Sequence, residues 1–224
     1  MNQRLVTHTL NRRILTVLLP ALLIPVLLLL AGCAKGGTGN LPFVETFDNA
    51  GNWGTGEDAY SIGTVVDGVY DFKVLESDIS RWVSAGKNFG DGVYQVEATP
   101  VGGPLDNGYG LLLRANAEAG NFYLFKVSSD GYVWIGRYEN GSEAATIIGN
   151  HWFESPAVLR GLNVTNVLKV QAEAGNLIFY VNDQEVGRVT DNTLTTGDVG
   201  ILVQSLSGSG VRVLFDNLSV HPLP

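Results

Sequence analysis

The chain has 224 residues and a mass of 24.0 kDa, which fits one domain of ordinary size with a short appendage. Its 28 glycines, 16% charged residues and 45% hydrophobic residues exclude collagen, charge-rich disordered chains and coiled coils. The formal net charge is −8, and beyond residue 32 the 11 basic and 22 acidic residues give −11. This charge argues against a nucleic-acid partner, because no cationic excess is available to release phosphate counterions.

The first segment in chain order is an uncharged apolar run. Residues 14–32 read ILTVLLPALLIPVLLLLAG and follow Arg12 and Arg13, as in the basic and apolar regions of a signal peptide. The alternative is an uncleaved membrane helix, because the run approaches the ~20 residues that cross a bilayer. Pro20 and Pro25 weaken such a helix.

The end of the apolar run distinguishes these two interpretations. Leu30, Ala31, Gly32 and Cys33 resemble the lipobox of bacterial lipoproteins, in which small residues precede an obligatory cysteine. Cys33 is the only cysteine, so it has no disulfide partner in the chain and cannot belong to a multi-cysteine metal site. The resemblance implies cleavage before Cys33 and a diacylglyceryl thioether on it. Membrane lipid is then a partner, on the extracytoplasmic face of the cell membrane or outer membrane.

A short polar stretch follows the cysteine. Residues 34–40 read AKGGTGN, which is rich in glycine and almost free of apolar side chains. This composition predicts a flexible tether with a reach on the order of 15 Å. The expected organisation is therefore a signal peptide at 1–32, lipidated Cys33 with its tether to residue 40, and a folded domain at 41–224.

The remaining chain has the pattern of a β protein. Gly, Asn and Asp punctuate short segments that are rich in Val, Tyr, Phe and Ile and often alternate, which is typical of an all-β sandwich or barrel. No stretch of the domain sustains a helical period. The clearest predicted strands span 68–74, 93–99, 108–115, 122–128, 132–138, 167–172, 177–182, 199–204 and 211–220.

Turn residues predict how these strands connect. Small or left-handed-tolerant residues at 129–131, 174–176 and 181–184 favour hairpins, so consecutive strands are expected to be antiparallel neighbours. A single open sheet of this many strands would twist too far, so two stacked sheets with a core about 10 Å thick are expected. A two-sheet antiparallel jelly-roll sandwich satisfies these requirements.

Several short strings also carry a family resemblance. They are FDN at 47–49 with Trp53, DGVY at 67–70, NGYG at 107–110 with Arg114, NFY at 121–123, FYVN at 179–182 and FDNL at 215–218. Together they resemble the concanavalin A-like lectin/glucanase superfamily, and within it the laminin G-like and 3-keto-disaccharide hydrolase-like jelly rolls of bacterial surface proteins. The resemblance covers residues 43–221. It implies the fold and not the function, because this scaffold carries lectins, hydrolases and adhesion modules.

Alternation along the predicted strands assigns side chains to faces. On 122–128, Tyr123, Phe125 and Val127 share one face, so the charged Lys126 points away from the core. The same alternation in three other predicted strands leaves five further polar or aromatic side chains pointing outward. If these strands share a sheet, one outer surface carries Gln95, Glu97, Arg114, Lys126, Tyr132 and Trp134.

Such a surface has two interpretations. As a sugar platform, its aromatic rings would stack on the C–H face of a pyranose while its polar groups bond the hydroxyls. Alternatively, Glu97 and Arg114 form a cross-strand ion pair, and Tyr132 and Trp134 merely cover the sheet. The other three tryptophans in the chain are predicted to be core or loop-packing residues: Trp53, Trp82 and Trp152.

Catalysis finds little support in the sequence. Retaining jelly-roll glycanases carry Glu-x-Asp-x-x-Glu, whereas the nearest string here, residues 76–81, reads ESDISR and ends in Arg81. A motif that lacks its acid/base residue is inert. A lyase-like role for Glu97 with Lys126 or Arg114 is chemically conceivable, but nothing in the sequence demands it.

Metal binding is equally weakly indicated. His151 and His221 are far apart and the domain has no cysteine, so a zinc site is not expected. Asp48, Asn49 and Asp216 are candidates for a Ca²⁺ site, since the resemblance brings both ends of the domain together. The alternative, in which these residues form turns and bulges, is favoured.

Three functional hypotheses follow. The first is a lipid-anchored module without catalysis of its own that binds carbohydrate or a cell-surface protein through the face carrying Trp134. The second, which the resemblance to 3-keto-disaccharide hydrolase-like domains allows, is a hydrolase or lyase that acts on a modified disaccharide. The third is a structural spacer without a ligand.

Overall fold

The computed structural model describes residues 37–224, so the predicted signal peptide and Cys33 lie outside the described residues. The described part consists of β-strands joined by turns and loops. Within it, no helix is long and apolar enough to cross a membrane.

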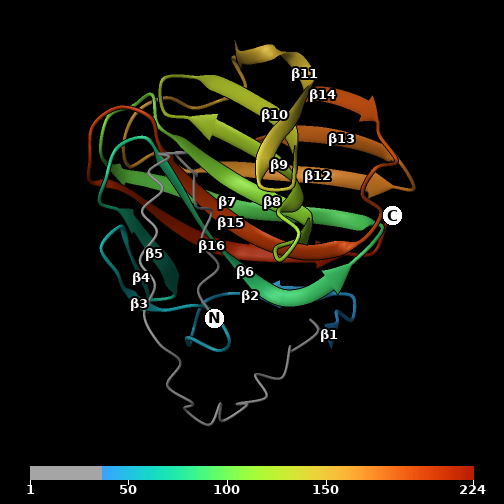
Figure 1. Cartoon of the computed structure of the whole chain (residues 1–224), viewed down its shortest axis with the longest axis horizontal. Coiled ribbons are helices and arrows are strands. Elements are labelled where there is room, and N and C mark those ends of the chain that lie inside the picture. Colours follow the sequence, from blue (N-terminus) through green and yellow to red (C-terminus); the bar gives the residue numbers. More distant parts are fainter. Residues whose placement is uncertain (1–36) are drawn as a thin grey trace, which may run out of the picture.

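One layer is a seven-stranded sheet, called sheet A, with the order β1-β6-β15-β8-β9-β10-β11 (Figure 1). All its neighbouring strands are antiparallel except the short parallel pair of β1 and β6. In chain order its strands are β1 (Gly37–Thr38), β6 (Ile79–Phe89), β8 (Gly108–Asn116), β9 (Asn121–Ser128), β10 (Tyr132–Glu139), β11 (Ser142–Glu154) and β15 (Gly197–Ser205).

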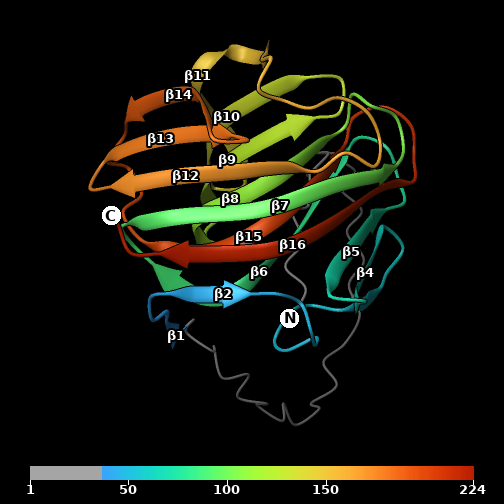
Figure 2. The same cartoon turned by 180° about the vertical axis from the view of Figure 1, so that it is seen from behind.

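The second layer, called sheet B, has the order β14-β13-β12-β7-β16-β5-β4-β3, with β2 beside β16 (Figure 2). All its pairs are antiparallel. Its strands are β2 (Phe43–Glu45), β3 (Gly56–Glu57), β4 (Ser61–Val66), β5 (Val69–Val74), β7 (Gly92–Gly102), β12 (Asn166–Glu173), β13 (Asn176–Val181), β14 (Gln184–Thr190) and β16 (Val211–His221).

The predicted fold class is confirmed. Every strand predicted from the sequence is present, and the three predicted turns each join an antiparallel hairpin. The architecture is a two-sheet antiparallel sandwich of the jelly-roll type. Four longer strands were not predicted, namely β4, β6, β11 and β14.

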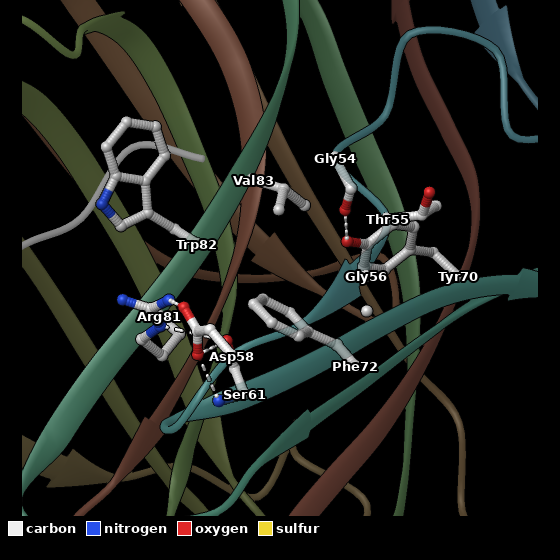
Figure 3. A pocket seen from close by; sticks show the side chains of 11 residues that line it. Gly54, Thr55, Gly56, Asp58, Ser61, Tyr70, Phe72, Arg81, Trp82 and Val83 are labelled. Atoms are coloured by element: carbon white, nitrogen blue, oxygen red, sulfur yellow. Dashed lines mark hydrogen bonds and ion pairs between the residues drawn. The ribbon is translucent and has the colours of Figure 1, made fainter. Parts of the chain in front are cut away.

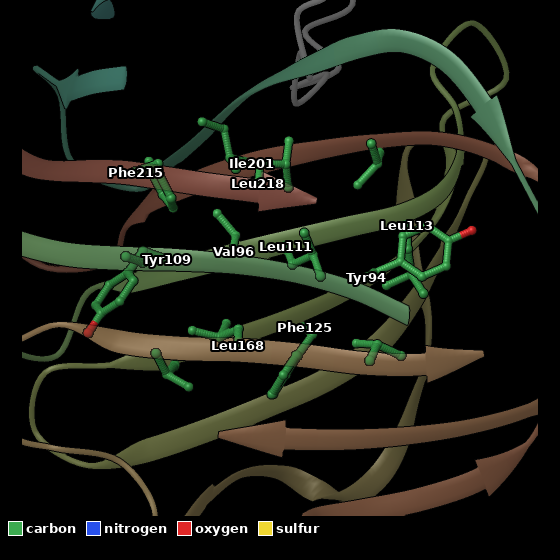
Figure 4. Close-up of a cluster of buried hydrophobic side chains, with 14 of the residues drawn as sticks. Tyr94, Val96, Tyr109, Leu111, Leu113, Phe125, Leu168, Ile201, Phe215 and Leu218 are labelled. Carbon is green, nitrogen blue, oxygen red and sulfur yellow. The ribbon is translucent and has the colours of Figure 1, made fainter. Parts of the chain in front are cut away.

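The main core fills the space between the sheets, and the predicted inward faces supply it. It includes Tyr94 and Val96 from sheet B and Leu111 and Phe125 from sheet A (Figure 4). The ring of Phe125 meets that of Phe179 edge to face, with centroids 5.3 Å apart. Burying each such side chain stabilises the fold by roughly 1.5–3 kcal/mol, so this layer supplies most of the cohesion between the sheets.

A second apolar cluster lies on the opposite, outer face of sheet A. Its members alternate with core residues along their strands, which turns them away from the sandwich interior. They are Trp82, Leu112, Ala115, Phe122, Leu124, Trp134 and Leu202, with Ala117, Tyr138 and Trp152 packed against them. Sheet A is therefore apolar on both faces, unlike an antiparallel sheet with one solvated side.

Both described chain ends lie at the same end of the sandwich. Within the stretch predicted to be a tether, β1 pairs with Lys87 and Asn88 of β6, and the amide of Gly39 donates to the Asn88 carbonyl at 2.9 Å. At the other terminus, His221 of β16 pairs with Val93, just beyond the β6–β7 turn. The chain thus enters and leaves beside that turn (Figures 1 and 2).

Candidate functional site

The six side chains expected on one surface do not share one. β7 belongs to sheet B, whereas β8, β9 and β10 belong to sheet A. Gln95 and Glu97 consequently lie on the outer face of sheet B, where Gln95 pairs in register with Lys169 and Glu97 with Asp216. The expectation that these strands form one surface was wrong, because alternation tells inside from outside but does not tell which sheet a strand joins.

Arg114 does not point outward either. A bulge interrupts the pairing of β8 with β9 at this residue, whose φ is 51°, and its side chain is fully buried. Its guanidinium donates to the carbonyls of Ala174 at 3.0 Å and Leu194 at 2.9 Å, and pairs with Asp91 at 2.9 Å. Arg114 therefore ties sheet A to sheet B at one end of the sandwich, and the predicted pair with Glu97 is replaced by one with Asp91.

Lys126, Tyr132 and Trp134 do lie on the outer face of sheet A, where Lys126 and Trp134 pair in register. The Lys126 ammonium lies 4.0 Å from the centre of the Trp134 ring and 5.1 Å from that of Trp152, and it donates to Gln204 Oε1 at 2.6 Å. These four residues, Lys126, Trp134, Trp152 and Gln204, are called the Lys126 cluster. They come from β9, β10, β11 and β15.

An irregular stretch of β11 brings Trp152 into the cluster. The pairing of β11 with β10 shifts between Ile148 and Phe153, and the bulged residues include Gly149 and His151, with φ values of 73° and 132°. Such a bulge re-aims the side chains next to it. The sequence placed Trp152 among packing residues, and no periodic signal could have indicated its role, because the bulge breaks the alternation.

Two glycines make room for the indole rings. A Cβ atom added to Gly136 would lie 2.3 Å from the Trp134 ring, and one added to Gly108 would lie 3.1 Å from the Trp152 ring. Each ring therefore packs directly on the backbone of a glycine, and a side chain at that position would displace the ring. This arrangement fixes both rings on the sheet and places Lys126 beside both of them.

Burial differs sharply across this face. Trp134 is 1% exposed, so the expectation of an exposed ring was wrong, and Lys126 is 3% exposed. Tyr132 is 37% exposed, while Trp152 and Gln204 are half-buried. A ligand approaching sheet A would therefore meet Tyr132, Trp152 and Gln204 before the two deeper residues.

The charge state of Lys126 is finely balanced. Burial lowers the pKa of its ammonium to about 7, and the nearby carboxylate of Glu143 acts in the opposite direction. The faces of Trp134 and Trp152 also favour the charged form, because an indole ring attracts a cation. Among the described residues, no carboxylate lies within 4.0 Å of this ammonium.

A retaining glycanase needs two carboxylates about 5 to 5.5 Å apart. The outward positions nearest to the Lys126 cluster on β8, β9 and β15 are Gly108, Leu124 and Leu202. Glu76 and Asp78, from the string that resembles the glycanase motif, are exposed in the bend before β6.

A small cavity of about 20 Å³ lies elsewhere, between β4, β5 and β6 (Figure 3). Arg81 pairs with Asp58 and donates to Ser61 Oγ at 3.1 Å. Burial opposes ionisation of Asp58, but amide bonds from Tyr60 and Ser61 and the charge of Arg81 outweigh it and lower the pKa of this carboxyl group. A cavity of this size holds about one water molecule, so these groups are structural.

Within residues 37–224, no three His, Cys, Asp or Glu side chains come together in a group that could hold a metal ion. Asp48 accepts a hydrogen bond from Thr46 Oγ1 at 2.7 Å, and Asp216 accepts one from the Asn217 amide at 2.6 Å. Two of the three candidate Ca²⁺ ligands, Asp48 and Asp216, thus make local hydrogen bonds.

No protein-family model and no curated protein sequence matches this chain. Solved structures do match it. Carbohydrate-binding module CBM66 from Bacillus subtilis has a TM-score of 0.59 and 20% identity, covering 74% of this chain and 92% of its own. A Bacillus licheniformis beta-glucanase has a TM-score of 0.58 and 16% identity, covering 84% and 100%. The Crh5 transglycosylase in complex with NAG has a TM-score of 0.62 and 9% identity, covering 85% and 87%.

These likenesses establish the fold. At 20% identity or less, they show that the chain shares the two-sheet jelly-roll fold of these proteins. The scaffold itself does not decide function, which depends on the side chains placed on it.

Proposed function

We propose that the domain is a carbohydrate-binding module without catalysis of its own, and that the Lys126 cluster on sheet A is its binding face. The observation that carries this proposal is the gathering of two indole rings, an ammonium and an amide on one outer sheet face. Aromatic rings supply flat apolar surface for a sugar ring, and the polar groups orient its hydroxyls. The fold shared with a carbohydrate-binding module supports the same assignment.

On the outer face of sheet A, Trp152 of the Lys126 cluster and Tyr132 are the residues that a sugar would touch first. Both are accessible, whereas Trp134 lies beneath and supports Lys126. A beta-glucanase and a transglycosylase share the fold, so hydrolysis or lysis of a modified disaccharide is the competing function. The absence of a carboxylate next to the cluster on β8, β9 and β15 favours binding.

Replacing Trp152 with alanine is expected to weaken oligosaccharide binding by about tenfold or more, because stacking aromatics act as binding hot spots. Affinity gel electrophoresis with mixed-linkage β-glucan, xylan and polygalacturonate measures this, and product analysis of the same mixtures detects any turnover. Tyr180→Ala is the matched control, since Tyr180 also lies on an outer sheet face beside a lysine, Lys169, but on sheet B. Unchanged retardation of Trp152→Ala would remove this face from consideration.

We also propose that the domain is held at a membrane surface through lipid on Cys33. The support is the lipobox-like end of the apolar run, together with the glycine-rich residues that separate it from β2. At ~0.8 kcal/mol per buried methylene, two or three acyl chains anchor a protein stably. The binding face would then work on the extracytoplasmic side.

The Cys33→Ser variant is expected to lack the lipid adduct and therefore to be lost from the membrane fraction. The domain should keep its fold, because residue 33 precedes every described strand. Mass spectrometry of the membrane fraction tests this directly. An unprocessed N-terminus without a diacylglyceryl adduct on wild-type Cys33 would contradict the lipoprotein assignment and leave residues 14–32 as a signal anchor.

A further inference from the structure

Lys126 is the one buried lysine among residues 37–224, and it is also a lysine without a carboxylate partner. The other lysines described, at positions 73, 87 and 169, are half-buried. The described ion pairs involve Arg81, Arg114, Arg137, Arg160, Lys169, Arg188 and Arg212. The most deeply placed ammonium thus has no carboxylate within 4.0 Å among the described residues, and the charge of Glu143 acts on it only from farther away.

The neighbours of Lys126 meet only part of the hydrogen-bonding capacity of its ammonium. Gln204 Oε1 accepts one of its three N–H groups, and the two indole faces attract its charge without accepting a conventional hydrogen bond. A buried ammonium without a counter-ion is costly, and an apolar side chain of similar length would fill the position without that cost. The fold alone therefore gives no reason for a lysine here, which indicates a role in binding.

Gln204 adds a second donor beside the ammonium. Its Oε1 atom is turned toward Lys126, so its Nε2 atom is the free end of the amide, and no described residue accepts a hydrogen bond from it. An ammonium and an amide N–H₂ side by side match the two oxygens of a carboxylate. Hydroxyl groups of a neutral sugar need no such charge.

We propose that the Lys126 cluster selects acidic sugars, with the carboxylate of a uronic acid unit bound by Lys126 and Gln204 and its ring stacked on Trp152. This inference rests on the proposed carbohydrate-binding function and specifies its ligand class. Trp152 is half-buried and its ring centre lies 5.1 Å from the Lys126 ammonium, so a sugar stacked on the accessible part of this ring lies beside the ammonium. The carboxylate of the ligand then supplies a counter-ion in direct contact with Lys126, which Glu143 does not.

The inference predicts a dependence of affinity on pH. Lys126 must be protonated to pair with a carboxylate, and its pKa in the unliganded protein is about 7. Glu143 of β11 is the titratable group acting on it, while Trp134 of β10, Gly108 of β8 and Gln204 of β15 are neutral. Affinity for acidic sugars should therefore be full below pH 7 and fall about tenfold per pH unit above it.

The decisive experiment compares oligosaccharides that contain glucuronate, galacturonate or mannuronate, each as the free acid and as the neutral methyl ester, by calorimetric titration at pH 6. We expect the wild-type protein to bind one of the free acids at least tenfold more tightly than its ester. Lys126→Met should reduce that preference to within about twofold, because the ammonium is gone. Lys169→Met is the matched control and should keep the preference, since Lys169 pairs with Asp183 on sheet B.

The outcomes separate this inference from the function on which it rests. Equal binding of acid and ester that still requires Trp152 would overturn the acidic-sugar inference and leave carbohydrate binding intact. Binding of neither form, nor of any neutral polysaccharide, would overturn both. If Lys126→Met does not fold, the pH series on the wild-type protein decides, because a flat affinity between pH 6 and pH 9 contradicts a role for the ammonium.

Discussion

Replacing Arg114 with methionine is expected to lower the free energy of unfolding by about 3–5 kcal/mol. The guanidinium is fully buried and serves two carbonyls, those of Ala174 and Leu194, as well as Asp91. Removing it takes away two hydrogen bonds from a charged donor, at about 1.5–3 kcal/mol each. Asp91 is 49% exposed on its side chain and can turn to water, so it adds little to the loss.

Equilibrium unfolding in urea measures this change. Arg188→Met is the control, because Arg188 is exposed and pairs only with Glu185 three residues earlier, so its loss should change stability by less than about 1 kcal/mol. If both variants lost equally little stability, the contacts of Arg114 between the two sheets would not stabilise the fold as described above. A normal oligosaccharide affinity in a refolded Arg114→Met protein is also expected, since Arg114 lies away from the binding face.

Truncating Trp134 to alanine is expected to cost about 3–5 kcal/mol, the range for a buried tryptophan. Its ring supports Lys126, meets Tyr138 edge to face with centroids 6.1 Å apart, and covers Gly136. The change would open a cavity in the outer cluster of sheet A and leave the Lys126 ammonium without one of its two aromatic neighbours.

Tyr132→Ala provides the comparison for Trp134, because it lies two residues earlier on the same strand and face but is 37% exposed. Its loss should cost no more than about 1 kcal/mol. Urea unfolding of the two variants gives the free energy of unfolding and its slope against urea concentration. An unchanged slope shows that stability changed and not the surface area exposed on unfolding. Similar small losses for both residues would mean that Trp134 is an open surface ring, as the sequence alone suggested.

Much of the fold was predictable because its strands are regular. The inward residues of β8 and β9 were identified from alternation, and they all join the main core. The missed strands break that pattern. In β6, polar residues such as Ser80, Arg81 and Lys87 disguise a strand whose inward side chains include Val83 and Ala85. In β11, shifts in pairing against β10 destroy the period of two.

The candidate site was predictable only in part. The sequence placed Lys126 on the correct face, because this residue lies on a regular strand. The rest was missed for three physical reasons. Arg114 was misplaced because a bulge with a left-handed residue reverses its direction. Gln95 and Glu97 were assigned to the wrong sheet because long-range pairing of β7 with β12 and β16 leaves no local trace. Trp152 and Gln204 come from distant segments that only tertiary pairing brings to Lys126.

With the proposed lipid anchor at Cys33, the position of β2 has a mechanical consequence. Pulling on the chain ahead of β2 draws this strand along its own axis, past β16, with Phe43 opposite Val220 and Glu45 opposite Leu218. Antiparallel ladder bonds lie perpendicular to that direction, so they carry the load together and do not open one at a time. Phe43, packed on Phe89 with ring centroids 5.3 Å apart, must leave the core in the same step. Force on a bound glycan would thus be resisted by shear at β2, together with the short pair of β1 and β6 ahead of it in the chain.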